Sequence, residues 1–164
     1  MKQREVAGEV MFEIDSLYVS TEMILSRRFR EFPLDGLLLE ACLLHFRVVW
    51  DFFYRPKKKR TDVVVRDYVP GWTDVDPPAR LRDIREKGRW LDVMIAHLTT
   101  HRVDPNYKVG EITEEDITLM RSHTKTLFDA FVSAPIAADH RAALVNPLAH
   151  KFVRYEILDA KNMA

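Results

Sequence analysis

The feature that most constrains this chain is an almost entirely apolar segment, residues 35–54, that lies between Pro33 and Pro56. Asp35 is suited to cap a helix, and a proline disfavours helix in the residue before it, so the segment predicts one helix of about five turns. After Asp35, its clearly polar residues are Glu40, His45, Arg47 and Asp51. At about 100° per residue, all of these but the histidine fall in one narrow stripe. Because an otherwise apolar helix needs other helices around it, we expect this one at the centre of the fold.

Three further helices are predicted from periodicity and capping signals. Apolar side chains recur at three- and four-residue steps over residues 5–28, and again from Pro78 to Leu98. Thr113 and Asp116 have the spacing of a capping box, which predicts the start of a fourth helix. That helix is expected to end near residue 133.

The links between these helices set the expected topology. Short links favour antiparallel neighbours, but residues 55–77 form a long connection between the second and third helices. Residues 137–145 and 148–158 are expected to add one or two short C-terminal helices. We therefore expect a single all-α domain over residues 1–164, built as an antiparallel four-helix bundle.

Charge and cysteine content exclude several classes of function. Lys+Arg and Asp+Glu each total 25, so no overall field draws the chain to nucleic acid or to anionic lipid. Cys42 is the sole cysteine, which excludes an intramolecular disulfide, and its apolar neighbours predict a core thiol rather than a nucleophile. The first residues are charged, and no uncharged stretch approaches the ~20 residues of a membrane span. We expect a cytoplasmic protein with no membrane partner.

The histidines are the first candidates for chemistry. His45 is expected to point into the core, where a hydrogen-bonded imidazole is the ordinary outcome. His97 and His101 are four residues apart and share a helix face, and such a pair can bind a metal ion if a third ligand joins it. His45 or the carboxylate of Glu22 could supply that ligand. Two interpretations follow: a packed polar group with no cofactor, or a site for one divalent transition metal at His45, His97 and His101.

Basic residues form the second candidate, a nucleic-acid patch at one end of the bundle. Its members close the first predicted helix and follow the third: Arg27, Arg28, Arg30, Arg102 and Lys108. Such cations can neutralise phosphates, and Phe29, His101 and Tyr107 could stack on bases at the same end. The simpler interpretation is that cations near a helix C-terminus stabilise the helix itself.

Two segments resemble a family of uncharacterised small helical proteins of bacteria. Residues 43–53 (L-L-H-F-R-V-V-W-D-F-F) and 96–102 (A-H-L-T-T-H-R) carry its H-x-R-x-x-x-D-F-F and A-H-L-T-x-x-R patterns. The likeness covers well under half of the chain, and it implies no assigned activity. It implies a buried polar network between two helices, made of His45, Arg47, His97 and Arg102.

Two other bundle families offer comparisons. HEPN ribonucleases use R-x-x-x-x-H, and no arginine here precedes a histidine at that spacing, so their cleavage chemistry is not implied. The damage-inducible bundle metalloproteins use one early histidine and a later H-x-x-x-H followed by arginine. This chain is similar in that order, although Val103 stands where the family has glycine; the matching residues are His45, His97, His101 and Arg102.

Together these observations favour a non-enzymatic helical-bundle module that binds a partner. The partner would be a second copy in a homodimer, another protein or RNA, with Trp72 and Trp90 as surface anchors. The alternative is a metal-dependent hydrolase or transferase that uses His45, His97 and His101.

Overall fold

The structure is a computed structural model that describes residues 3–27, 34–56, 59, 62–86 and 112–136. These residues form the helices α1 (Gln3–Leu25), α2 (Leu34–Tyr54), α3 (Ala79–Glu86) and α5 (Glu114–Ser133), and the short 3-10 helix η1 (Val65–Asp67). They contain no strand, so the prediction of an all-α protein is confirmed for the described part of the chain. The predicted C-terminal helices, and the predicted third helix beyond residue 86, lie outside the described residues.

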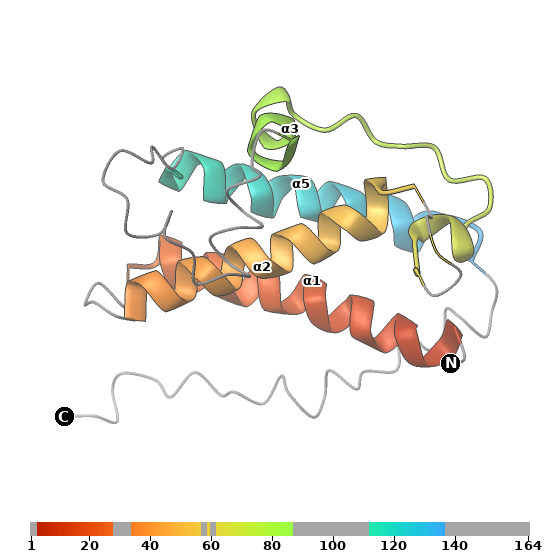
Figure 1. Cartoon of the computed structure of the whole chain (residues 1–164), viewed down its shortest axis with the longest axis horizontal. Helices are drawn as coiled ribbons and strands as arrows, with labels where there is room; N and C mark the ends of the chain where they lie inside the picture. The colour runs from red at the N-terminus through yellow and green to blue at the C-terminus, as the bar shows by residue number, and fades with distance from the viewer. Residues whose placement is uncertain (1–2, 28–33, 57–58, 60–61, 87–111, 137–164) are drawn as a thin grey trace.

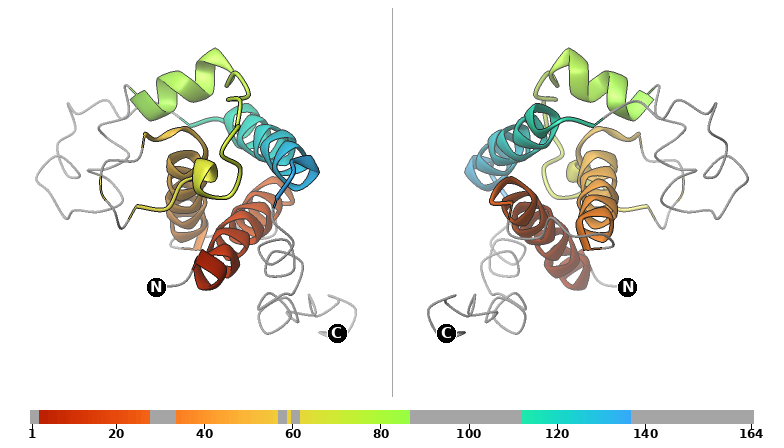
Figure 2. Two further views of the ribbon diagram at one scale, coloured as in Figure 1. Left: turned by 90° about the vertical axis from the view of Figure 1, so that its right-hand side faces the viewer. Right: turned by 90° about the vertical axis from the view of Figure 1, so that its left-hand side faces the viewer.

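The three long helices form the body of the described structure. α1 and α2 run in opposite directions and make its most extensive helix contact (Figure 1). α5 packs against both of them and runs in the same direction as α2 (Figure 1). α3 is seen almost end-on in Figure 1 and lengthwise in Figure 2, so it lies across the long helices rather than alongside them.

The predicted capping box at the start of α5 is present and also anchors α3. The Asp116 N–H donates to Oγ1 of Thr113 at 3.2 Å, and the Thr113 N–H donates to Oδ2 of Asp116 at 3.0 Å. Arg80 of α3 adds two bonds to the same carboxylate, from Nε and from a terminal nitrogen, both at 2.7 Å. One carboxylate therefore satisfies a helix terminus and fixes a second helix against it.

α2 contributes more of the core than any other described helix, as its composition predicts. Its buried side chains are Cys42, Leu43, Phe46, Val49, Trp50, Phe52 and Phe53. The helix is not enclosed on every side, however, because one face remains exposed in the described structure. That face carries three exposed apolar residues: Leu37 (57% exposed), Leu44 (41%) and Val48 (39%).

The segment after α2 is part of the core and not merely a connection. Val65 and Tyr68 are buried, and the rings of four aromatic residues surround Phe131 of α5. The ring centroids lie 5.7 Å from Phe131 for Phe52, 6.0 Å for Phe53, 6.1 Å for Tyr68 and 6.4 Å for Trp72. Trp72 thus packs inward, which corrects its assignment as a surface anchor; Trp90 lies outside the described residues.

Candidate partner-binding groove between α1 and α2

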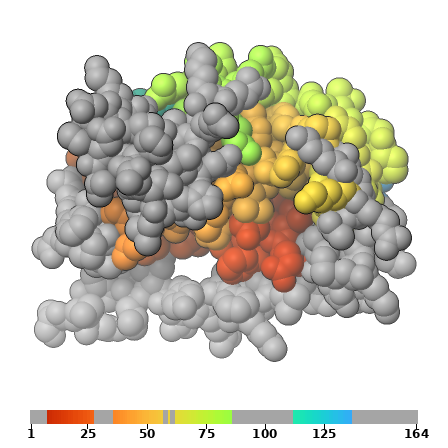
Figure 3. Space-filling view, viewed as in Figure 1, coloured from red at the N-terminus to blue at the C-terminus, as the bar shows by residue number. Residues whose placement is uncertain are grey.

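An open groove of about 280 Å³ lies where α1, α2 and residues 62–64 meet. Its floor is apolar: Val10, Ile14, Val48, Val49, Phe52, Phe53, Val63 and Val64. Its charged lining residues are Glu9, Glu13, Asp51, Arg55 and Asp62. In Figure 3, α1, α2 and the segment after α2 reach the same face of the molecule. An apolar floor with a charged border is the usual anatomy of a binding surface.

Helical spacing explains why these side chains share the groove. Val10 and Ile14 are four residues apart on α1, and Val48 and Phe52 are four apart on α2, so each pair lies on one helix face. The antiparallel packing of the helices brings the two faces together. Residues 62–64 complete the lining, and Val64 and the following Val65 are buried.

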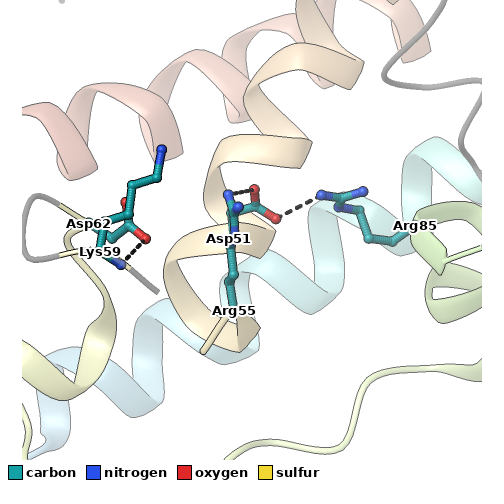
Figure 4. Close-up of polar contacts among 5 residues, drawn as sticks. All are labelled: Asp51, Arg55, Lys59, Asp62 and Arg85. Atoms are coloured by element: carbon teal, nitrogen blue, oxygen red, sulfur yellow. Dashed lines mark hydrogen bonds and ion pairs between the residues drawn. The ribbon is translucent and has the colours of Figure 1, made fainter. Parts of the chain in front are cut away.

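The α2 side of the groove is an ion-pair network (Figure 4). Arg85 of α3 donates to Oδ1 of Asp51 at 2.9 Å, and Arg55 donates to Oδ2 at 3.3 Å. In the segment after α2, the Lys59 backbone N–H donates to Oδ2 of Asp62 at 3.0 Å. The charge of Asp51 is therefore shared by two guanidinium groups, and the contact with Arg85 holds α3 to α2.

The α1 side of the groove carries a different pair, Glu13 with His45. Nδ1 of His45 lies 2.7 Å from Oε2 of Glu13, and both side chains are about one-fifth exposed. Phe12 packs edge-on against the imidazole, with 6.1 Å between ring centroids. His45 thus has the predicted hydrogen bond, made to the neighbouring helix α1, but it lies at the border of α1 and α2, which corrects the expectation that it points into the core.

The remaining members of the predicted polar network are only partly described. Arg47 is half-buried on α2, whereas His97 and Arg102 lie outside the described residues. The contact found for His45 is with Glu13 of α1. The register of α1 against α2 determines this pairing, and no local sequence signal predicts it.

The predicted metal site is likewise only partly within the described residues. His97 and His101 lie outside them, and Glu22 pairs with Arg121 of α5 at 2.7 Å. The part of the chain that the structure describes has no group of three or more His, Cys, Asp or Glu placed to hold a metal ion.

Cys42 is buried, and burial raises the pKa of its thiol to about 12. That pKa leaves almost no thiolate near neutral pH, as its apolar setting predicted.

Arg27 is the member of the predicted nucleic-acid patch that the structure describes. It donates to Oε2 of Glu114 at 2.8 Å, and both side chains are more than half exposed. Glu114 belongs to the acidic first turn of α5, with Glu115 and Asp116. The other members of the patch, Arg28, Arg30, Arg102 and Lys108, lie outside the described residues.

A second polar cluster, which sequence reasoning missed, ties α2 to α5. The Tyr54 hydroxyl donates to the carbonyl oxygen of Val75 at 2.7 Å and lies 2.7 Å from Nε2 of His123. Because the hydroxyl has one hydrogen, Nε2 of His123 is the donor in the second bond. Burial lowers the pKa of His123, which favours the neutral imidazole, while Asp76 opposes that shift. The cluster is part-buried and joins two helices to the loop before α3, so we assign it a structural role.

No known protein family, curated protein or solved structure matches the chain. Among the described residues, no helix has both the length and the apolar character that crossing a membrane requires. The groove and its charges are therefore the features of the molecule from which a function can be inferred.

Proposed function

We propose that this chain is a non-enzymatic, cytoplasmic helical-bundle module that binds a protein partner through the groove between α1 and α2. For the whole chain we propose a four-helix arrangement in which α1 is antiparallel to α2 and α5 and α3 crosses them, with short helices after residue 136. We also propose a relationship to the small helical bacterial proteins that residues 43–53 and 96–102 resemble.

The observation that carries this proposal is the exposed apolar surface that continues from the groove. Val48 lines the groove, and Leu44 and Leu37 follow it along the outward face of α2. Phe12 of α1 is also exposed beside His45. A soluble protein rarely leaves a contiguous apolar surface with a charged border open to water unless something binds it.

Protein is favoured over RNA at this surface because of the charges on its border. Four carboxylates and one guanidinium line the groove, and carboxylates repel phosphate groups. RNA binding at the end patch of Arg27, Arg28 and Arg30 remains a separate prediction.

The proposal predicts that a charge placed in the apolar lining of the groove abolishes binding. The chain is used as bait in an extract of its source cells, as the natural sequence and as the Val48→Lys and Val132→Lys variants. Val132 lies on α5, outside the groove lining, and its exposure (37%) matches that of Val48 (39%). We expect a protein that the natural chain and Val132→Lys retain and that Val48→Lys loses. Equal retention by all three baits would contradict a role for the groove.

One contact favours the alternative, a metal-dependent hydrolase or transferase that uses His45, His97 and His101. Metal-bound histidines commonly direct their second ring N–H at a carboxylate, and Glu13 is placed to accept such a bond from Nδ1 of His45. Elemental analysis of protein purified without a chelator or a histidine tag tests it. About one transition-metal ion per chain, lost in His45→Ala and His97→Ala, would support this alternative.

A further inference from the structure

We infer that the partner segment is a basic amphipathic helix, which lies along the groove with its apolar side on the floor and its lysines or arginines toward α1. This inference rests on the proposed function, which it narrows from a protein partner to one chemical class of partner segment. Three features of the groove support it.

The first feature is the shape and chemistry of the floor. Side chains from two antiparallel helices, Val48 among them, form a strip that continues into Leu44. A strip of this kind suits a helix that presents apolar residues at three- and four-residue steps. An extended strand needs an open sheet edge to add to, and the described residues contain no strand.

The second feature is the sign of the charge on the two sides. Asp51 is already shared by Arg55 and Arg85, so the α2 side is largely neutralised. On the α1 side, Glu9 is exposed and Glu13 has a histidine as its partner. A cation on the partner would therefore gain the strongest electrostatic attraction on the α1 side. Arg55 opens the basic run of residues 55–60, so cations on the partner are expected to face α1 instead of that end.

The third feature argues against a second copy of this chain as the occupant. A twofold dimer brings the same patch of both copies together. Glu9 and Glu13 of one copy would then meet a groove whose α1 side carries the same two carboxylates. Like charges at an interface are unfavourable, whereas a basic helix turns the same groups into attractive pairs.

The test uses two labelled peptides of about 15 residues, a length at which an isolated helix begins to form. One is built of leucine and lysine at amphipathic helical spacing, and the other has glutamate in place of each lysine. Fluorescence anisotropy measures the binding of each peptide to the full chain and to four variants. Glu9→Lys and Val48→Lys change the groove, while Glu115→Lys and Val132→Lys make the same exchanges at exposed positions outside its lining.

We expect the lysine peptide to bind the natural chain, and the glutamate peptide to bind far more weakly. Glu9→Lys and Val48→Lys should each weaken binding of the lysine peptide by about tenfold, and the two control variants by less than about twofold. Equal weakening by all four variants would mean a non-specific charge effect and would overturn the inference. Circular dichroism confirms that each variant is folded, and Glu9→Gln repeats the charge test with a smaller change.

Other outcomes separate this inference from the proposed function. If the glutamate peptide binds and Val48→Lys alone abolishes that binding, the groove is a docking site but the basic chemistry is wrong. If neither peptide binds, the basic helix is rejected, while the extract experiment still decides whether a protein partner uses the groove. A concentration-dependent dimer that Val48→Lys dissociates and Val132→Lys does not would identify a second copy as the occupant.

Discussion

Replacing Phe131 by alanine is expected to lower the free energy of unfolding by about 3–5 kcal/mol. The side chain is fully buried, and the rings of Phe52, Phe53, Tyr68 and Trp72 pack around it. These rings come from α2 and from the segment that follows it, so alanine would leave a cavity where three parts of the chain meet. Urea unfolding followed by far-ultraviolet circular dichroism measures the loss.

The matched control for Phe131 is its neighbour Val132, which is exposed on the same helix. Val132→Ala should change the free energy of unfolding by no more than about 0.5 kcal/mol. Phe131→Leu should fall between the two, because leucine refills part of the cavity. A loss below about 1 kcal/mol for Phe131→Ala would contradict the central place of this aromatic cluster in the core.

Replacing Asp116 by alanine is expected to lower the free energy of unfolding by about 2–3 kcal/mol. The substitution removes the carboxylate that accepts the Thr113 N–H in the capping box of α5, together with both bonds from Arg80, and the side chain of Asp116 is only 5% exposed. Glu115→Ala is the control, since Glu115 is exposed in the same helical turn and takes no part in the capping box. A similar loss in both variants would mean that the capping box and the α3 contact add nothing beyond the charge.

The effect of Asp116 has a defined pH dependence. The Arg80 guanidinium above all, with the bond from the Thr113 backbone, lowers the pKa of Asp116 from 3.8 to about 2. A carboxylate with a lowered pKa stabilises the fold above the unfolded value and loses that contribution as the pH falls through the folded one. The difference in stability between the natural chain and Asp116→Asn should therefore be constant above pH 5 and shrink from about pH 4 towards pH 2. A difference that stays unchanged over this range would place the origin of the effect outside the ionised carboxylate.

Elements with local signals could be predicted from the sequence. α2 is marked by its composition and flanking prolines, and α5 begins at the predicted capping box of Thr113 and Asp116. Both signals act within a few residues, so they need no knowledge of the fold. The inward packing of Tyr68 and Trp72 depends on contacts with Phe131 of α5, which lies about sixty residues later in the chain. No local sequence pattern predicts such a contact.

The groove could not be predicted for the same physical reason. Its members come from α1, α2 and residues 62–64, and only the register between the two helices brings Glu13 to His45. The composition of α2 predicted burial on most sides, so Leu44 and Val48 were expected inside the protein. Their exposure in the described structure is what turns an apolar helix into a candidate binding surface.

The measurement that tests the central claim most directly is photo-crosslinking from inside the groove in living cells. A photoreactive phenylalanine analogue replaces Val48 in one version of the chain and Val132 in the other. We predict a discrete covalent adduct with another protein from position 48 and none from position 132, with the partner segment basic and helical when mapped. No adduct from position 48, or the same adducts from both positions, would contradict the claim that the groove between α1 and α2 binds a partner.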